Sequence, residues 1–166
     1  MQILSKLSQV VILSIATIFV VGCGGGESNS SSDTFAQNIQ GKWYPNKTNK
    51  GCFPNSKLKI LMDVDEDTMI VHHKIYSKNG CKDADLIKIM DRVFSYAIGA
   101  KTHGKDGKEA YEIDISETNN SNDYTMFRLI DNKLFTAKKD GNRDGTTKNK
   151  RKNMFEDDRF FIKFTN

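Results

Sequence analysis

Residues 57–75 read KLKILMDVDEDTMIVHHKI, and this stretch decides the fold class. Apolar side chains alternate with polar ones on either side of its acidic centre, Asp63–Asp67. An alternation with a period of two is typical of a β-strand that buries one face and exposes the other to water. We therefore predict two strands, over residues 57–64 and 68–75, joined by an acidic turn.

Similar alternations follow along the chain, separated by polar segments that are typical of turns. The pair Asp131-Asn132 lies between two of them and predicts a tight hairpin. Residues 86–98 also fit a helical stripe, so a short helix over residues 84–92 is the alternative to a strand there. The additional strands are predicted over residues 86–98, 111–116, 124–130, 133–137 and 159–165.

The predicted strands, about eight in all, define an all-β domain. Short links between successive strands favour an antiparallel up-and-down meander. A meander of this size closes into a small barrel, because closure removes the exposed edges of the sheet. Such a barrel is either filled by its own side chains or holds one small ligand.

The N-terminus indicates export from the cell. A short start that contains Lys6 precedes the apolar run Val10–Val21, which only Ser14 and Thr17 interrupt. As a helix, this run reaches about 18 Å, well short of a hydrocarbon core of about 30 Å. Residues 1–22 are therefore predicted to be a cleaved signal peptide rather than a membrane span.

The apolar run ends in Val20-Val21-Gly22-Cys23, which resembles the lipobox of bacterial lipoproteins. The resemblance implies cleavage before Cys23 and a diacylglyceryl group on its thiol, with fatty acyl chains such as palmitate. Several buried acyl chains make a stable membrane anchor. Because Gly24 stands where an Asp would favour the inner membrane, the resemblance implies a lipid-anchored protein of the bacterial envelope, in the outer membrane.

The segment Gly24–Asp33 contains only small and polar residues. It has no apolar area to bury and is predicted to be a flexible tether. The predicted organisation is a signal peptide over residues 1–22, a lipidated cysteine and tether over residues 23–36, and a barrel domain over residues 37–166.

The chain has three cysteines, and the predicted anchor leaves Cys52 and Cys81. An even pair in an exported domain favours a disulfide. The bridge would close a loop of about 29 residues and stabilise the fold by at most roughly 3.6 kcal/mol in the chain-entropy model. Two buried free thiols are the alternative.

Residues 39–44 read Ile-Gln-Gly-Lys-Trp-Tyr and resemble the Gly-x-Trp opening strand of the lipocalins. The resemblance covers most of residues 38–166 and implies that Trp43 closes one end of a ligand-binding barrel. Lipocalins also carry a late Arg that packs on this Trp, and the sequence alone places no residue there.

Charge is concentrated in residues 138–152, which contain seven cations and two anions. Such a loop predicts a positive patch that could contact an anionic envelope component, and a solvated loop is the alternative. The cations of the predicted patch are Lys138, Lys139, Arg143, Lys148, Lys150, Arg151 and Lys152.

No residue pattern predicts catalysis. Neither a Ser-His-Asp set nor a Cys-His or paired-carboxylate arrangement can be argued. The adjacent His72 and His73 would point to opposite faces of a strand and cannot bind one metal ion together. We therefore expect no enzyme activity, no cofactor, no metal site and no nucleic-acid partner, in a monomeric protein.

Two functions remain open at this stage. The first is an envelope lipoprotein whose barrel binds a small apolar ligand. The alternative is a non-catalytic interaction or structural lipoprotein, including an inhibitor, that acts through its surface on a protein, a glycan or an anionic lipid. The sequence does not separate them, because inward-facing apolar residues either fill a barrel or line a pocket.

Overall fold

The structure is a computed structural model that describes residues 29–117 and 121–165. These residues form an all-β domain with one α-helix, as the alternating pattern predicted. The elements are α1 (Asn29–Ile39), β1 (Gly41–Pro45), β2 (Leu58–Val64), β3 (Thr68–Tyr76), η1 (Asp83–Asp85), β4 (Leu86–His103), β5 (Glu109–Glu117), β6 (Asn122–Ile130), β7 (Lys133–Thr136), η2 (Lys148–Lys150) and β8 (Phe161–Lys163).

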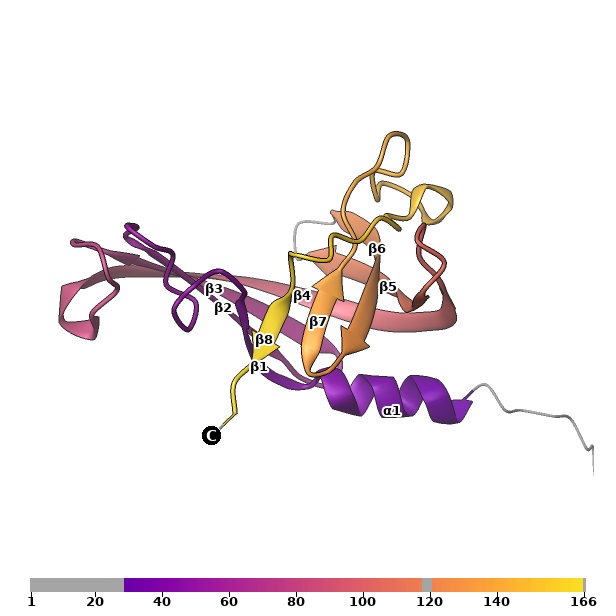
Figure 1. The fold of residues 1–166 in the computed structure, drawn as a ribbon, viewed down its shortest axis with the longest axis horizontal. Helices are drawn as coiled ribbons and strands as arrows, with labels where there is room; N and C mark the ends of the chain where they lie inside the picture. The colour runs from indigo at the N-terminus through magenta and orange to yellow at the C-terminus, as the bar shows by residue number, and fades with distance from the viewer. Residues whose placement is uncertain (1–28, 118–120, 166) are drawn as a thin grey trace, which may run out of the picture.

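The strands form a closed antiparallel barrel in the order of the sequence (Figure 1). Each strand pairs with the next, and β8 pairs back with β1 through Tyr44 and Ile162. The predicted meander and its closure are therefore confirmed. The turn between β6 and β7 is the predicted Asp131-Asn132 hairpin, in which both residues have a positive φ, 49° and 58°, as a type I′ turn requires.

The segment that the sequence left ambiguous is a strand. β4 runs without interruption over Leu86–His103, and the alternative helix over residues 84–92 is wrong except for the 3₁₀ turn η1. The register explains this result, because β3 pairs with the first half of β4 and β5 pairs with the second half. The first half projects beyond β5 together with β2 and β3, and we call this projection the arm (Figure 1).

The prediction of a tether over residues 23–36 is wrong for residues 29–36, which are helical. Residues from Asn29 onward form α1, which belongs to the barrel domain. Phe35 and Ile39 lie on one face of the helix and are buried, because residues four apart share a face. Phe35 stacks on Tyr111 with ring centroids 4.0 Å apart. The folded domain therefore includes helix α1 and does not begin at residue 37.

Two further predictions fall on the N-terminal segment. The signal peptide over residues 1–22 and the lipidated Cys23 lie outside the described residues. In the part of the chain that is described, no helix is long and apolar enough to cross a membrane.

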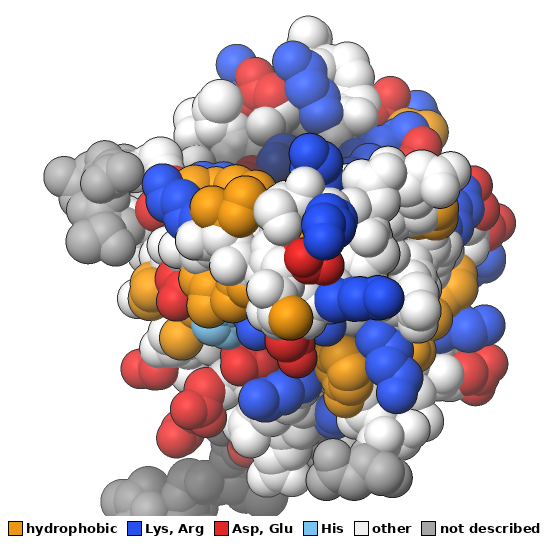
Figure 2. All heavy atoms as spheres, turned by 90° about the vertical axis from the view of Figure 1, so that its left-hand side faces the viewer, with side chains coloured by type: hydrophobic (Ala, Val, Ile, Leu, Met, Phe, Trp, Pro, Cys, Tyr) orange, Lys and Arg blue, Asp and Glu red, His pale blue; other side chains and the backbone are white. Residues whose placement is uncertain are grey.

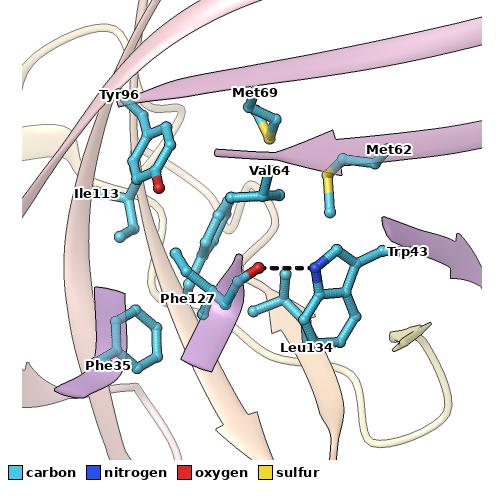
Figure 3. Packing of buried hydrophobic residues seen from close by; sticks show 10 residues of the cluster. Phe35, Trp43, Met62, Val64, Met69, Tyr96, Ile113, Phe127 and Leu134 are labelled. Atoms are coloured by element: carbon cyan, nitrogen blue, oxygen red, sulfur yellow. Dashed lines mark hydrogen bonds between the residues drawn. The ribbon is translucent and has the colours of Figure 1, made fainter. Parts of the chain in front are cut away.

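Trp43 lies at the end of the barrel that α1 covers. Its side chain is fully buried, and its indole Nε1 donates a hydrogen bond to the carbonyl of Ile39 at 2.8 Å (Figure 3). The remaining members of this core are Phe35, Met62, Val64, Met69, Tyr96, Ile113, Phe127 and Leu134.

The disulfide predicted between Cys52 and Cys81 is present, with the two Cα atoms 6.0 Å apart. It joins the loop between β1 and β2 to the segment that precedes η1. Both segments lie at the tip of the arm, so the disulfide cross-links the two loops at the end of the sheet that is farthest from α1 (Figure 1).

Candidate functional site

A cavity of about 370 Å³ lies inside the barrel, toward the end opposite α1. The two ends can be followed along β5. Tyr111, at the start of the strand, packs on α1, whereas Ile115 and Glu117, at its end, line the cavity. The half of the barrel next to α1 is packed solid and the other half is open.

The wall of the cavity comes from inward-facing residues of the seven strands β2 to β8. Alternation along each strand places every second side chain inside, which is why one strand often contributes two wall residues. Met62, Met69 and Phe127 are buried and also belong to the packed core, so they form the base of the cavity. The apolar residues that line the cavity are Met62, Met69, Val71, Phe94, Ile115, Phe127, Ala137 and Phe161.

The mouth of the cavity carries two ion pairs. Arg92 binds Glu117 through two hydrogen bonds of 3.0 and 2.8 Å, and Lys152 binds Asp123 at 2.7 Å. The guanidinium hydrogen bonds to Glu117 are the main cause of the lowered pKa of this carboxyl. The four charges cancel in pairs, so the rim is polar without a net charge.

The loop after β7 packs against this rim through Gly145. Gly145 has a φ of +82°, and a Cβ atom there would clash with Asp123 Oδ1 and would lie 2.8 Å from Lys152 Cε. Its carbonyl also accepts a hydrogen bond from the Tyr124 N–H at 2.9 Å. A glycine is needed at this contact, both for its backbone conformation and for the close approach.

The predicted basic patch is not a single surface. Arg151 is buried, with a side chain 5% exposed, and does not belong to it. Its guanidinium donates to the carbonyls of Ile113 and Thr125 at 2.9 and 3.1 Å and to Asp114 Oδ1 at 2.6 Å. Burial raises the pKa of Asp114, but hydrogen bonds from Arg151 and Lys148 outweigh it, so that this pKa is lowered. Arg151 therefore fastens the loop to the barrel.

Three other cations of the predicted patch are neutralised by carboxylates. Lys138 pairs with Glu156, Lys148 with Asp114, and Lys152 with Asp123 at the cavity mouth. Among the described residues, Lys139, Arg143 and Lys150 have no carboxylate within ion-pair distance and are exposed. The net charge of residues 138–152 is thus a poor guide to the charge that this loop presents to solvent.

A second buried arginine was not singled out from the sequence. Arg128 makes two hydrogen bonds of 2.7 Å to Asp106, and its guanidinium lies 3.9 Å from the centroid of the Phe155 ring. These contacts hold the turn after β4 and the segment before β8 together. The sequence carries no signal for this site, because the two partners are 22 residues apart and no spacing rule relates them.

The histidines stay outside the cavity. His72 lies on the outer face of the barrel, with Nδ1 2.7 Å from Asp91 and Nε2 3.4 Å from Asp63. His73, the next residue on the strand, points to the opposite face. Within the described ranges, no three His, Cys, Asp or Glu side chains gather as metal ligands.

Comparisons with known proteins identify no relative of this chain. Searches of protein-family models, of curated proteins and of solved structures give no match for this chain. The class of the protein is therefore defined by its geometry, which is an eight-stranded antiparallel barrel with a helix at one end and an apolar cavity at the other.

Proposed function

We propose that this protein binds a small apolar ligand in the open half of its barrel. The observation that carries the proposal is the cavity itself, about 370 Å³ inside an otherwise packed barrel. Pockets for small molecules are typically of about 300–1,000 Å³ and are mostly apolar, with a few polar groups that orient the ligand. The wall and the rim described above fit this pattern.

The division between wall and rim favours a ligand with one polar end. Its apolar part would lie between Phe94 and Phe127, where water is displaced favourably. Its polar end would remain at the mouth, beside the ion pairs of Arg92 and Lys152. Both methionines at the base are flexible and polarisable, and such side chains adapt to ligands of different shapes.

We also propose that the binding takes place at a bacterial membrane. This part rests on the resemblance of residues 20–23 to a lipobox. Helix α1 begins six residues after Cys23, and six extended residues span at most about 20 Å. A lipid on Cys23 would hold the barrel close to the membrane by its packed end and leave the cavity mouth at the other end.

The second candidate function, interaction through the surface, is supported by one observation. Five apolar side chains of the arm are exposed on β4. They are separate from the ligand cavity, and both functions can coexist in one chain.

The test is the binding of a fluorescent apolar probe, N-phenyl-1-naphthylamine, to residues 29–166. These residues are suited to the measurement, since every strand has both of its neighbours within them. Val71→Trp, which fills the cavity, should reduce the affinity at least tenfold. Ile70→Trp places the same side chain on the outer face of the same strand and should leave the affinity unchanged.

Mass spectrometry of the native protein complements the probe. A discrete mass of a few hundred daltons that is released by solvent and is absent from Val71→Trp would identify a natural ligand. Equal probe binding by the parent chain and Val71→Trp would contradict the proposal, because the probe would then bind outside the cavity.

A further inference from the structure

The barrel wall is interrupted between β7 and β8. The pairing of these two strands consists of two residue pairs and ends at Leu134 and Phe161. The segment before β8 meets the segment after β7 again at the bridge between Met154 and Lys138. Thr136 lies between these contacts, and among the residues that the structure describes it has no partner in β8. The wall is therefore closed at the level of Leu134, in the packed core, and interrupted at the level of Thr136, which lines the cavity.

A groove of about 520 Å³ lies along this interruption. It is larger than the cavity, and five apolar residues from the strands and loops beside the interruption line it. All five are half-buried, so the groove is partly shielded from water. The apolar residues that line the groove are Pro45, Phe53, Ile60, Phe160 and Phe161.

The groove and the cavity are neighbours. Thr136 and Phe161 line both of them. The inner face of β2 also continues from one to the other, because Met62 lines the cavity and Ile60 lines the groove. These two residues are two positions apart on one strand and therefore share a face. The side chains of Thr136 and Phe161 thus separate two apolar spaces that lie next to each other.

The charged residues that line the groove are paired with one another. Lys47 Nζ lies 2.6 Å from the Asp158 carboxylate, and Arg159 lies 4.0 Å from Glu156. Asn46 fastens the same segment, because its Nδ2 donates a hydrogen bond to the carbonyl of Asp158 at 2.6 Å. The groove therefore has a fixed outer side and an apolar interior, which suits an uncharged part of a ligand.

We propose that the ligand of the barrel is a long-chain amphiphile whose linear tail passes from the cavity, beside Phe161, into the groove. This inference rests on the proposed function and names the class of its ligand. The polar end would lie at the cavity mouth, beside Arg92 and Lys152, and the tail would be one unbranched apolar chain. A passage beside an aromatic side chain favours a flexible chain over a rigid fused-ring system.

The groove is a better site for such a tail than the exposed apolar surface of the arm. Figure 2 looks onto the end of the molecule from which the arm projects, and apolar side chains lie there in patches between charged ones. Ile87 and Ile89 of the arm are 66% and 47% exposed. A tail on such a patch would keep one side in water, whereas a groove covers it on several sides. The free energy gained grows with the apolar area that is removed from water.

The proposal predicts how the affinity depends on the length of the tail. Each methylene that is buried raises the affinity about fourfold. The affinity of the parent chain for saturated fatty acids should therefore keep rising from 8 to 16 carbons. If the groove were filled, the rise should stop at a shorter length, because the additional carbons would remain in water.

The test is the displacement of N-phenyl-1-naphthylamine from the full chain by saturated fatty acids of 8, 12 and 16 carbons, each below its micelle concentration. Ile60→Trp fills the groove and should weaken the binding of the 16-carbon acid at least tenfold. It should change the binding of the 8-carbon acid less than twofold. Ile70→Trp, the same replacement on the outer face of β3, is the matched control and should leave both affinities unchanged.

A second measurement locates the end of the tail. Trp43, the only Trp of the chain, is buried at the packed end of the barrel, and Phe53→Trp adds an indole at the groove. Bromine quenches indole fluorescence only at short range. Hexadecanoic acid with bromine on its last carbon should therefore quench Phe53→Trp strongly and the parent chain weakly. Octanoic acid with bromine on its last carbon should quench neither strongly, because its tail ends inside the cavity.

The proposal is overturned if Ile60→Trp binds the 16-carbon acid as tightly as the parent chain does. The proposed function would then stand, with a ligand that is confined to the cavity. The double variant Ile87→Lys, Ile89→Lys should bind the 16-carbon acid normally, and a loss of binding only in this variant would place the tail on the arm and refute the proposal. Equal probe binding by Val71→Trp and the parent chain would instead remove the proposed function, and this inference with it.

Discussion

The ammonium group of Lys163 lies 5.4 Å from the centroid of the Trp43 ring, so a cation from the last strand covers the indole of the first strand. The same group donates a hydrogen bond to the carbonyl of Asn38 at 3.0 Å, near the end of α1. Lys163 thus connects three segments at the packed end of the barrel. The sequence alone placed no residue on Trp43, and in the structure this residue is Lys163.

Replacement of Lys163 by Met should lower the free energy of unfolding by about 1 kcal/mol, because the cation–π contact and the hydrogen bond to Asn38 are both lost. Lys163→Arg should retain most of the stability. Urea denaturation of the three proteins measures the difference. Lys139→Met, which removes an exposed lysine, serves as the control and should change the stability by less than about 0.5 kcal/mol.

Arg151→Met should be much more destabilising than any other single replacement in the predicted basic patch. The buried guanidinium satisfies the carbonyls of Ile113 and Thr125 and the carboxylate of Asp114. Breaking such a site leaves polar groups buried without partners and costs about 3 kcal/mol. Lys150→Met, one residue away in the same loop, should be nearly neutral, and an equal loss in both variants would contradict the buried role of Arg151.

The alternating strands were predictable because half-buried strands leave a period of two in the sequence. The helix α1 was not, because polar residues surround Phe35 and Ile39 and only their spacing of four residues indicates an apolar face. The sequence could identify inward-facing residues such as Phe94 and Phe127. It could not show that those next to α1 pack solidly while those at the mouth leave a cavity, since this depends on three-dimensional packing.

The basic loop shows the opposite limitation. A count of its charges treats Arg151 like Lys150, although one is buried and the other is exposed. The difference arises from contacts with Asp114, a residue far away in the sequence. A run of cations in a sequence therefore predicts a positively charged surface only where no carboxylate from a distant part of the chain pairs with those cations.

Phe35→Ala should destabilise the barrel by about 3 kcal/mol, because it removes a buried aromatic ring that stacks on Tyr111. A flexible tether at this position would predict no effect. Thermal unfolding of residues 29–166 measures the change, and Gln37→Ala, an exposed position on the same helix, is the control. A neutral result for Phe35→Ala would show that α1 does not belong to the folded unit.

The ion pair of Arg128 and Asp106 should make the stability depend on pH in the acid range. The hydrogen bonds from Arg128 are the main cause of the lowered pKa of Asp106 in the folded protein. The ionised carboxyl therefore favours the folded state above its unfolded pKa of about 4, and this contribution is lost as the pH falls through the lower folded pKa.

Asp106→Asn should consequently lower the stability at pH 6 and flatten its decline below about pH 4. Urea denaturation at a series of pH values gives both quantities. In the Arg128→Met background the same substitution should have little effect at any pH, because the partner that lowers the pKa is already absent. Asp106→Asn could also flatten the decline in stability below about pH 4 as strongly in the Arg128→Met variant as in the parent chain. The pH dependence would then arise from another contact of Asp106 and not from its pair with Arg128.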